Sequence, residues 1–156
     1  MSIFPTRVLL ATDGSEGARL AADTAATLAK GTGSELHVVC VGPGLPLYEL
    51  PDYPASFEEV ADAQRQMAQT VLDEEVERLE DSGATVASAR LESDGRPDRA
   101  IVRLGKELDA DLIVVGSRGL GGLKRALMGS VSASVVHHAY CPVLVVRPWQ
   151  ERTAEH

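Results

Sequence analysis

The residues Asp111–Val136, DLIVVGSRGLGGLKRALMGSVSASVV, form the most informative part of the chain. The β-branched apolar run Asp111–Val115 predicts a strand that is buried on both faces. A glycine-rich loop with three cations follows, and the helical spacing of apolar residues after Gly129 and Ser130 predicts the start of a helix. This order is typical of a phosphate site, because glycines let backbone N–H groups approach an anion and a helix start presents unpaired N–H groups.

Two well-known phosphate loops are excluded by the positions of the glycines. The residue after Gly121 is Gly122 rather than the lysine of a Walker A loop, and the third glycine of the dinucleotide fingerprint is missing. A surface loop that only connects two elements is the plain alternative, but such a connector does not need so many glycines. The spacing that fits is a glycine, two residues, a second glycine, nine residues, and a glycine followed by a hydroxyl residue: Gly116, Gly119, Gly129 and Ser130.

This spacing resembles the nucleotide-binding signature of the universal stress protein family, in the subgroup that binds ATP. The resemblance covers nearly the whole chain and rests on three segments in the family's order: Val8–Ser15 (VLLATDGS), Asp111–Ser132 and Cys141–Arg147 (CPVLVVR). It implies an α/β fold with one open, five-stranded parallel sheet in the order 3-2-1-4-5 and helices on both faces, like the adenine nucleotide alpha hydrolases. It also implies ATP across the ends of strands 1 and 4, and homodimers that pair the fifth strands, here Val143–Arg147.

The resemblance further implies which residues bind the nucleotide, with Mg²⁺ or Mn²⁺ held through the phosphates. Those expected around the adenosine moiety are Ala11, Thr12, Asp13 and Val41. Those expected at the ribose and phosphates are Gly116, Arg118, Gly119, Gly129, Ser130, Val131 and Ser132. Simpler roles stay open for some of them: Asp13 as a helix cap, Val41 as core, and Arg118, with Lys124 and Arg125, as solvated loop cations.

The rest of the chain alternates between strand and helix patterns, which indicates a mostly parallel sheet with right-handed crossovers. We expect one domain over residues 1–148 and a polar tail over 149–156. The expected strands are Arg7–Thr12, Ser34–Val41, Thr85–Glu92, Asp111–Val115 and Val143–Arg147. A long amphipathic helix is expected over Phe57–Asp81, with its acidic run DEEVERLED in solvent. The proline-rich loop Pro43–Pro54 is expected either to close over a nucleotide or to pack on a partner.

The length, charge and cysteine content of the chain bear on its domain count, its partners and its location. The 156 residues suit one domain, and the net charge of −8 argues against non-specific binding of nucleic acid or of anionic membranes. With no signal-peptide pattern and no run long enough to span a bilayer, we expect a cytoplasmic protein. Cys40 and Cys141 lie in or beside apolar runs and are expected to be buried, reduced thiols.

Three functions are consistent with these patterns to different degrees. The favoured one is a regulatory or stress-tolerance protein that binds ATP as a ligand, with at most slow hydrolysis, because the loop has no Glu or Gln to orient water. The second is a dimeric interaction module that needs no nucleotide. The third is phosphotransfer of the receiver type, which lacks support because only Asp13 follows the first strand, where an acidic pair is required.

Overall fold

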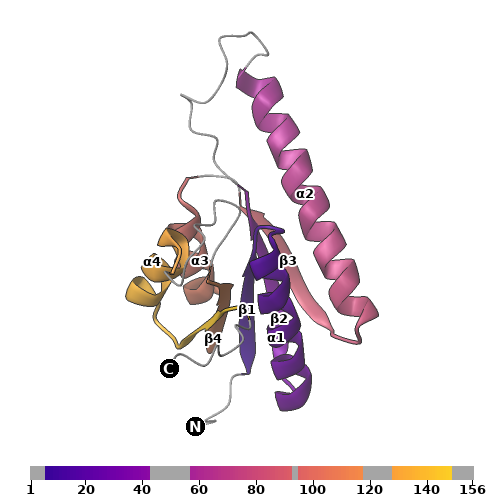
Figure 1. Cartoon of the computed structure of the whole chain (residues 1–156), viewed down its shortest axis with the longest axis vertical. Coiled ribbons are helices and arrows are strands. Elements are labelled where there is room, and N and C mark those ends of the chain that lie inside the picture. Colours follow the sequence, from indigo (N-terminus) through magenta and orange to yellow (C-terminus); the bar gives the residue numbers. More distant parts are fainter. Residues whose placement is uncertain (1–5, 43–56, 93–94, 118–127, 149–156) are drawn as a thin grey trace, which may run out of the picture.

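The computed structural model describes residues 6–42, 57–92, 95–117 and 128–148 of the chain. These residues form a five-stranded sheet in the order β3-β2-β1-β4-β5, in which every pair of neighbours is parallel (Figure 1). This order confirms the predicted topology. The strands are β1 (Arg7–Thr12), β2 (Glu35–Val41), β3 (Val86–Glu92), β4 (Leu112–Gly116) and β5 (Val143–Val146).

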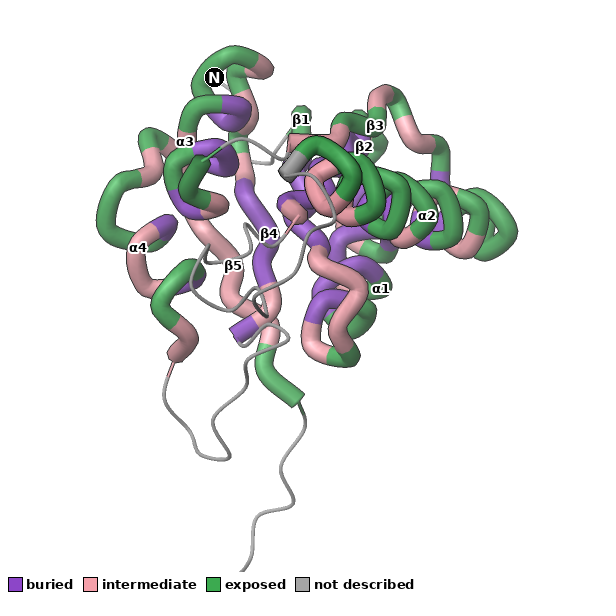
Figure 2. Tube along the Cα trace, turned by 90° about the horizontal axis from the view of Figure 1, so that it is seen from above, coloured by how far each residue is buried: buried purple, intermediate pink, exposed green. Residues whose placement is uncertain are grey.

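In the described part of the chain, four helices cover the two faces of the sheet, with α1 and α2 on one side and α3 and α4 on the other, as Figure 2 shows from above. The helices are α1 (Glu16–Thr32), α2 (Phe57–Asp81), α3 (Pro97–Glu107) and α4 (Ser130–His138). None of the helices in the described part of the chain is long and apolar enough to cross a membrane.

Helix α1 lies close to the sheet because its buried face consists of small side chains. All six of its buried residues are alanines. The helix begins at the N-cap Ser15, whose side-chain oxygen accepts a hydrogen bond from the N–H of Ala18. It ends at Gly33, whose φ of 68° is the left-handed conformation that glycine adopts most readily.

The core forms two apolar layers, one on each face of the sheet. Alternate residues of the central strand β1 point into opposite layers: Val8 and Leu10 pack with α1 and α2, while Leu9 and Ala11 pack with α3 and α4. Because both faces are covered, β1 is apolar along almost its whole length, as the sequence pattern predicts.

Several predicted boundaries differ from the structure by one residue. Strand β4 begins at Leu112 rather than Asp111; the carboxylate of Asp111 accepts hydrogen bonds from the N–H groups of Thr6 and Arg7 and from the hydroxyl of Thr6. β2 and β3 likewise begin one residue later than predicted, and β5 ends at Val146. The predicted tail and the loop Pro43–Pro54 lie outside the described residues.

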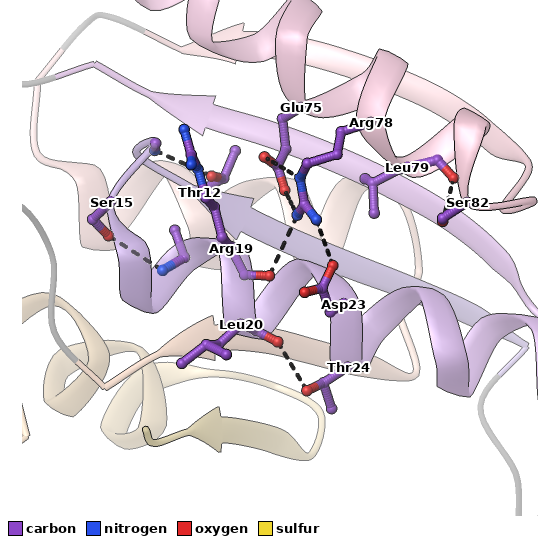
Figure 3. A network of polar contacts seen from close by, with 12 residues as sticks. Thr12, Ser15, Arg19, Leu20, Asp23, Thr24, Glu75, Arg78, Leu79 and Ser82 are labelled. Carbon is purple, nitrogen blue, oxygen red and sulfur yellow. Dashed lines mark hydrogen bonds and ion pairs between the residues drawn. The ribbon is translucent and has the colours of Figure 1, made fainter. Parts of the chain in front are cut away.

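One prediction about α2 is wrong in part. Glu75 belongs to the acidic run that was expected to be solvated, yet it is only 4% exposed. Its carboxylate accepts from the guanidinium of Arg78 at 2.7 Å, and that guanidinium also pairs with Asp23 of α1 (Figure 3). The buried charge is therefore part of the contact between α1 and α2.

Candidate nucleotide-binding site

The predicted site residues that the structure describes lie on elements that end or begin near the point where the strand order reverses. The chain runs from β1 outward to β2 and β3, and then returns to place β4 on the other side of β1. The ends of β1, β2 and β4 therefore meet at one edge of the sheet, with Thr12 beside Cys40 and Leu10 beside Val114. In open α/β sheets this switch point, outside the carboxyl ends of the strands, is where ligands bind.

The turn after β1 is held by its own polar groups. Thr12 is buried, and its side-chain oxygen accepts a hydrogen bond from the N–H of Gly14 at 3.2 Å. The Asp13 carboxylate accepts from the N–H of Ser15 at 2.9 Å. Since Ser15 itself caps α1, Asp13 shapes the turn rather than capping the helix, and the alternative of a simple helix cap is not what the structure shows.

Two glycines at this edge are required by packing inside the protein. A Cβ on Gly14, whose φ is +79°, would lie 2.8 Å from a methyl carbon of Val71 in α2. A Cβ on Gly116 would lie 2.8 Å from the carbonyl oxygen of Gly17 in the first turn of α1. The first glycine of the signature thus has a structural reason of its own, namely the close approach of β4 to α1.

Among the described residues, no side-chain hydrogen bond caps the start of α4. Its N-cap is Gly129, which has no side chain to bond the first N–H groups of the helix, and both Ser130 and Val131 are exposed. The N–H of Gly129 donates to the carbonyl of Ser117 at 2.7 Å, which fixes where the helix begins. A helix start without a side-chain cap offers N–H groups and a partial positive charge to a phosphate.

Ser132 has a different role from the one expected. The family resemblance implies that Ser132 lies at the phosphates, but Ser132 is only 3% exposed and its hydroxyl lies 3.2 Å from the carbonyl oxygen of Ser117 and 3.1 Å from that of Gly129. The hydroxyl therefore joins the two ends of the loop between β4 and α4. Ser130, in contrast to Ser132, is exposed at the start of the helix.

The remaining predicted residues divide into two groups. Val41 is 8% exposed and belongs to the apolar layer under α3, so its side chain is core, and only its backbone remains for a ligand. The residues that lie outside the described part of the chain are Arg118, Gly119, Lys124 and Arg125. Within the described residues, no cluster of three or more His, Cys, Asp or Glu side chains could hold a metal ion.

Helix α2 is a neighbour of the site that the sequence patterns do not reveal. Besides Val71 over Gly14, Ala68 lies over Gly42, where a Cβ would be 3.5 Å from that of Ala68. The same helix thus packs on the turn after β1 and on the residue after β2. Its spacing of apolar residues predicts burial, but not which part of the sheet the helix covers.

Comparison with known proteins gives the family. The model of the universal stress protein family matches residues 5–147. Universal stress protein YxiE of Bacillus subtilis is 34% identical over 147 residues, which cover 90% of this chain and 98% of YxiE.

Solved structures agree with the fold. Universal stress protein UspA from Lactobacillus plantarum aligns with a TM-score of 0.77 at 26% identity, over 94% of this chain and all of that one. A universal stress protein solved in complex with cAMP has a TM-score of 0.68 at 32% identity, over 91% and 97% of the two chains. The Archaeoglobus fulgidus protein solved in complex with dAMP has a TM-score of 0.62 at 27% identity, over 92% and 98%. This chain belongs to the universal stress protein family.

Proposed function

We propose that this protein binds ATP at the switch point between β1 and β4 and uses it as a regulatory ligand in stress tolerance. The proposal is carried by two contacts at the end of β4: Gly116 packs against Gly17 just after the Asp13 turn, and the carbonyl of Ser117 accepts from the N–H of Gly129 at the start of α4. The complexes of relatives with cAMP and dAMP support an adenine nucleotide as the ligand class. The proposal places the protein in the cytoplasm, where ATP is available.

The adenosine half would lie against the ends of β1 and β2. Ala11, Thr12 and Val41 are buried there, so they offer an apolar surface and backbone groups rather than exposed side chains. Asp13 is partly buried and carries a carboxylate, which accepts hydrogen bonds from sugar hydroxyls or from the amino group of adenine. A mostly apolar surface with a few placed polar groups is typical of a small-molecule site.

The phosphate half would lie at the start of α4. The backbone N–H groups of Ser130, Val131 and Ser132, with the Ser130 hydroxyl, form a donor set suited to phosphate oxygens. Because the described residues contain no acidic cluster for a metal, Mg²⁺ or Mn²⁺ would be held chiefly through the phosphates. The ion would then neutralise charge on ATP rather than occupy a site built by the protein.

ATP is proposed as a ligand and not as a substrate for fast hydrolysis. The residues from Gly116 to Ser132 contain no Glu or Gln, the types that orient an attacking water in nucleotide hydrolases. Control by a ligand requires that ATP bind two states of the protein with different affinity. Homodimerisation through β5 is part of the proposal, and the position of β5 at the edge of the sheet, with its four residues only partly buried, supports it.

The test is mass spectrometry of the purified protein, first under native conditions and then denatured, followed by equilibrium dialysis with ATP, cAMP and dAMP in the presence of Mg²⁺. The expected result is a dimer that carries ATP or takes it up at one site per chain. A protein that stays empty in every titration refutes the proposal. In that case the glycine at 116 would be explained by packing alone, and the nucleotide-independent interaction module would replace ATP binding as the function.

A further inference from the structure

Helix α4 is held on the protein by few contacts. It is nine residues long, and its buried residues are Ser132 and Val135. A helix of this length has little stability of its own in water, so its position depends on its neighbours. One apolar side chain fixes the distance of a helix from the sheet but not its rotation, and the polar contacts of α4 therefore decide where its first turn points.

Among the described residues, α4 makes a polar contact with α3. The Ser134 hydroxyl lies 2.7 Å from Oδ2 of Asp98, which stands in the first turn of α3 and is only 7% exposed. The guanidinium of Arg96 also binds this carboxylate, at 2.9 Å from Oδ2 and 3.2 Å from Oδ1. Burial works against the charge, yet the hydrogen bonds from Ser134 and Arg96 keep the pKa of Asp98 below its ordinary value.

The direction of the Ser134 hydrogen follows from the neighbouring histidine. Nδ1 of His138 lies 2.9 Å from the carbonyl oxygen of Ser134 and 3.3 Å from its hydroxyl. A carbonyl only accepts, so Nδ1 carries a hydrogen and donates. Nδ1 is then no acceptor for the hydroxyl, whose hydrogen points to Asp98. The serine is a donor to a buried carboxylate, a charge-assisted bond that is stronger than a neutral one.

Ser134 lies one turn beyond Ser130, on the same side of α4. We propose that Asp98, acting through Ser134, is a positioning residue for phosphate binding: the bond from α4 to α3 holds the first turn of α4 at the angle where its N–H groups meet the phosphates. The inference rests on the proposed function, because it assumes that phosphates bind at that turn. Asp98 itself touches no part of the ligand, and adenosine, which lacks phosphates, does not depend on this bond.

The test compares the affinities of ATP and adenosine, measured by calorimetry, for the wild type and for Ser134→Ala. We expect Ser134→Ala to bind ATP about three- to tenfold more weakly, the range for losing one hydrogen bond, and to bind adenosine as the wild type does. The matched control is Ser88→Ala. It removes a side-chain hydrogen bond of 2.6 Å to His37 between β3 and β2, and we expect it to change neither affinity.

A double-mutant cycle then tests whether Ser134 acts through Asp98. Asp98→Ala is expected to weaken ATP binding at least as much as Ser134→Ala, and the double variant no more than Asp98→Ala alone. Equal effects of Ser134→Ala on ATP and adenosine, or no effect on either, would overturn the positioning role while leaving ATP binding intact. A wild type that binds neither ligand would overturn both this inference and the proposed function.

Discussion

Replacing Arg78 tests how the contact between α1 and α2 is stabilised. The Arg78 guanidinium lies 2.7 Å from Oε1 of Glu75, 2.5 Å from Oδ1 of Asp23 and 3.4 Å from the carbonyl oxygen of Arg19. Figure 3 draws these three contacts as dashed lines. Its hydrogen bond to Glu75, more than any other contact, raises the pKa of Arg78 above its ordinary range. Arg78→Met keeps much of the apolar stem but leaves the Glu75 carboxylate buried without its cation.

The expected cost follows from the exposure of the partners. Removing one partner of a fully buried ion pair costs about 3–5 kcal/mol, because a desolvated charge is left behind. The Glu75 side chain is 5% exposed, but that of Arg78 is 37% exposed, so solvent screens part of the interaction. We therefore expect Arg78→Met to lower the free energy of unfolding by about 2 kcal/mol. Asp23→Asn, which removes the partner that is 60% exposed, is expected to cost less than about 1 kcal/mol.

Urea denaturation at pH 7, followed by circular dichroism, measures these differences. The decisive variant is the double replacement Glu75→Leu with Arg78→Met, which leaves no buried charge unpaired; Asp23, which also loses its partner, is 60% exposed. We expect it to regain most of the stability lost in Arg78→Met, because an apolar pair of similar volume replaces a buried ion pair at little cost. A single Arg78→Met variant as stable as the wild type, or a double variant less stable than Arg78→Met, would refute this account of the contact.

Three further predictions follow from the described contacts. Gly116→Ala should lower the free energy of unfolding by about 1–3 kcal/mol in urea denaturation, because the new Cβ meets the backbone of α1 at 2.8 Å; an unchanged midpoint would contradict this packing. Burial, with the nearby charges of Asp13 and Glu75, raises the pKa of Cys40 to about 11, so an aromatic disulfide reagent at pH 8 should label this thiol only after unfolding. The hydrogen bonds from Thr6 lower the pKa of Asp111 in the folded protein. The ionised carboxylate therefore stabilises the fold fully above about pH 4, and this stabilisation is lost as the pH falls through the lower folded-state pKa. In acid unfolding, the stability of Asp111→Asn should fall less with pH than that of the wild type.

The fold could be predicted from the sequence because each element carries its own pattern. The strand–helix alternation predicts a parallel sheet, and glycines such as Gly33 and Gly83, which have positive φ in the structure, are typical of helix ends. The strand order came from the family resemblance, since local patterns do not say which strands become neighbours. Boundaries differ by one residue where a side chain takes another role, as at Asp111.

The polar contacts between helices could not be predicted in the same way. Glu75 lies three residues after Leu72 and four before Leu79, on the apolar stripe of α2, but a glutamate at such a position is usually solvated. Its burial depends on Asp23 and Arg78 meeting across two helices. The bond from Ser134 to Asp98 joins residues 36 positions apart, and no local pattern predicts it.

The sequence could propose positions for the candidate site, but it could not assign the contacts that each residue makes inside the protein. The family resemblance pointed to Gly116, Gly129, Ser130 and Ser132 among others, and the structure places Gly116 at the end of β4 and the other three at the start of α4. It also separates their roles: Gly116 packs on α1, and the Ser132 hydroxyl closes the loop, whereas Ser130 is exposed. Such roles depend on contacts between segments that are distant in the sequence.

The most direct test of ATP binding at the start of α4 is calorimetric titration of Gly129→Val with ATP and Mg²⁺, beside the wild type. Gly129 has φ −63° and ψ 159°, a conformation that valine adopts, so the fold should survive at a cost of about 1 kcal/mol for the poorer N-cap. The matched control is Gly31→Val, where a Cβ meets nothing within 4 Å. We predict one ATP per chain for the wild type and the control, and none for a folded Gly129→Val. Wild-type affinity in that variant would contradict the site.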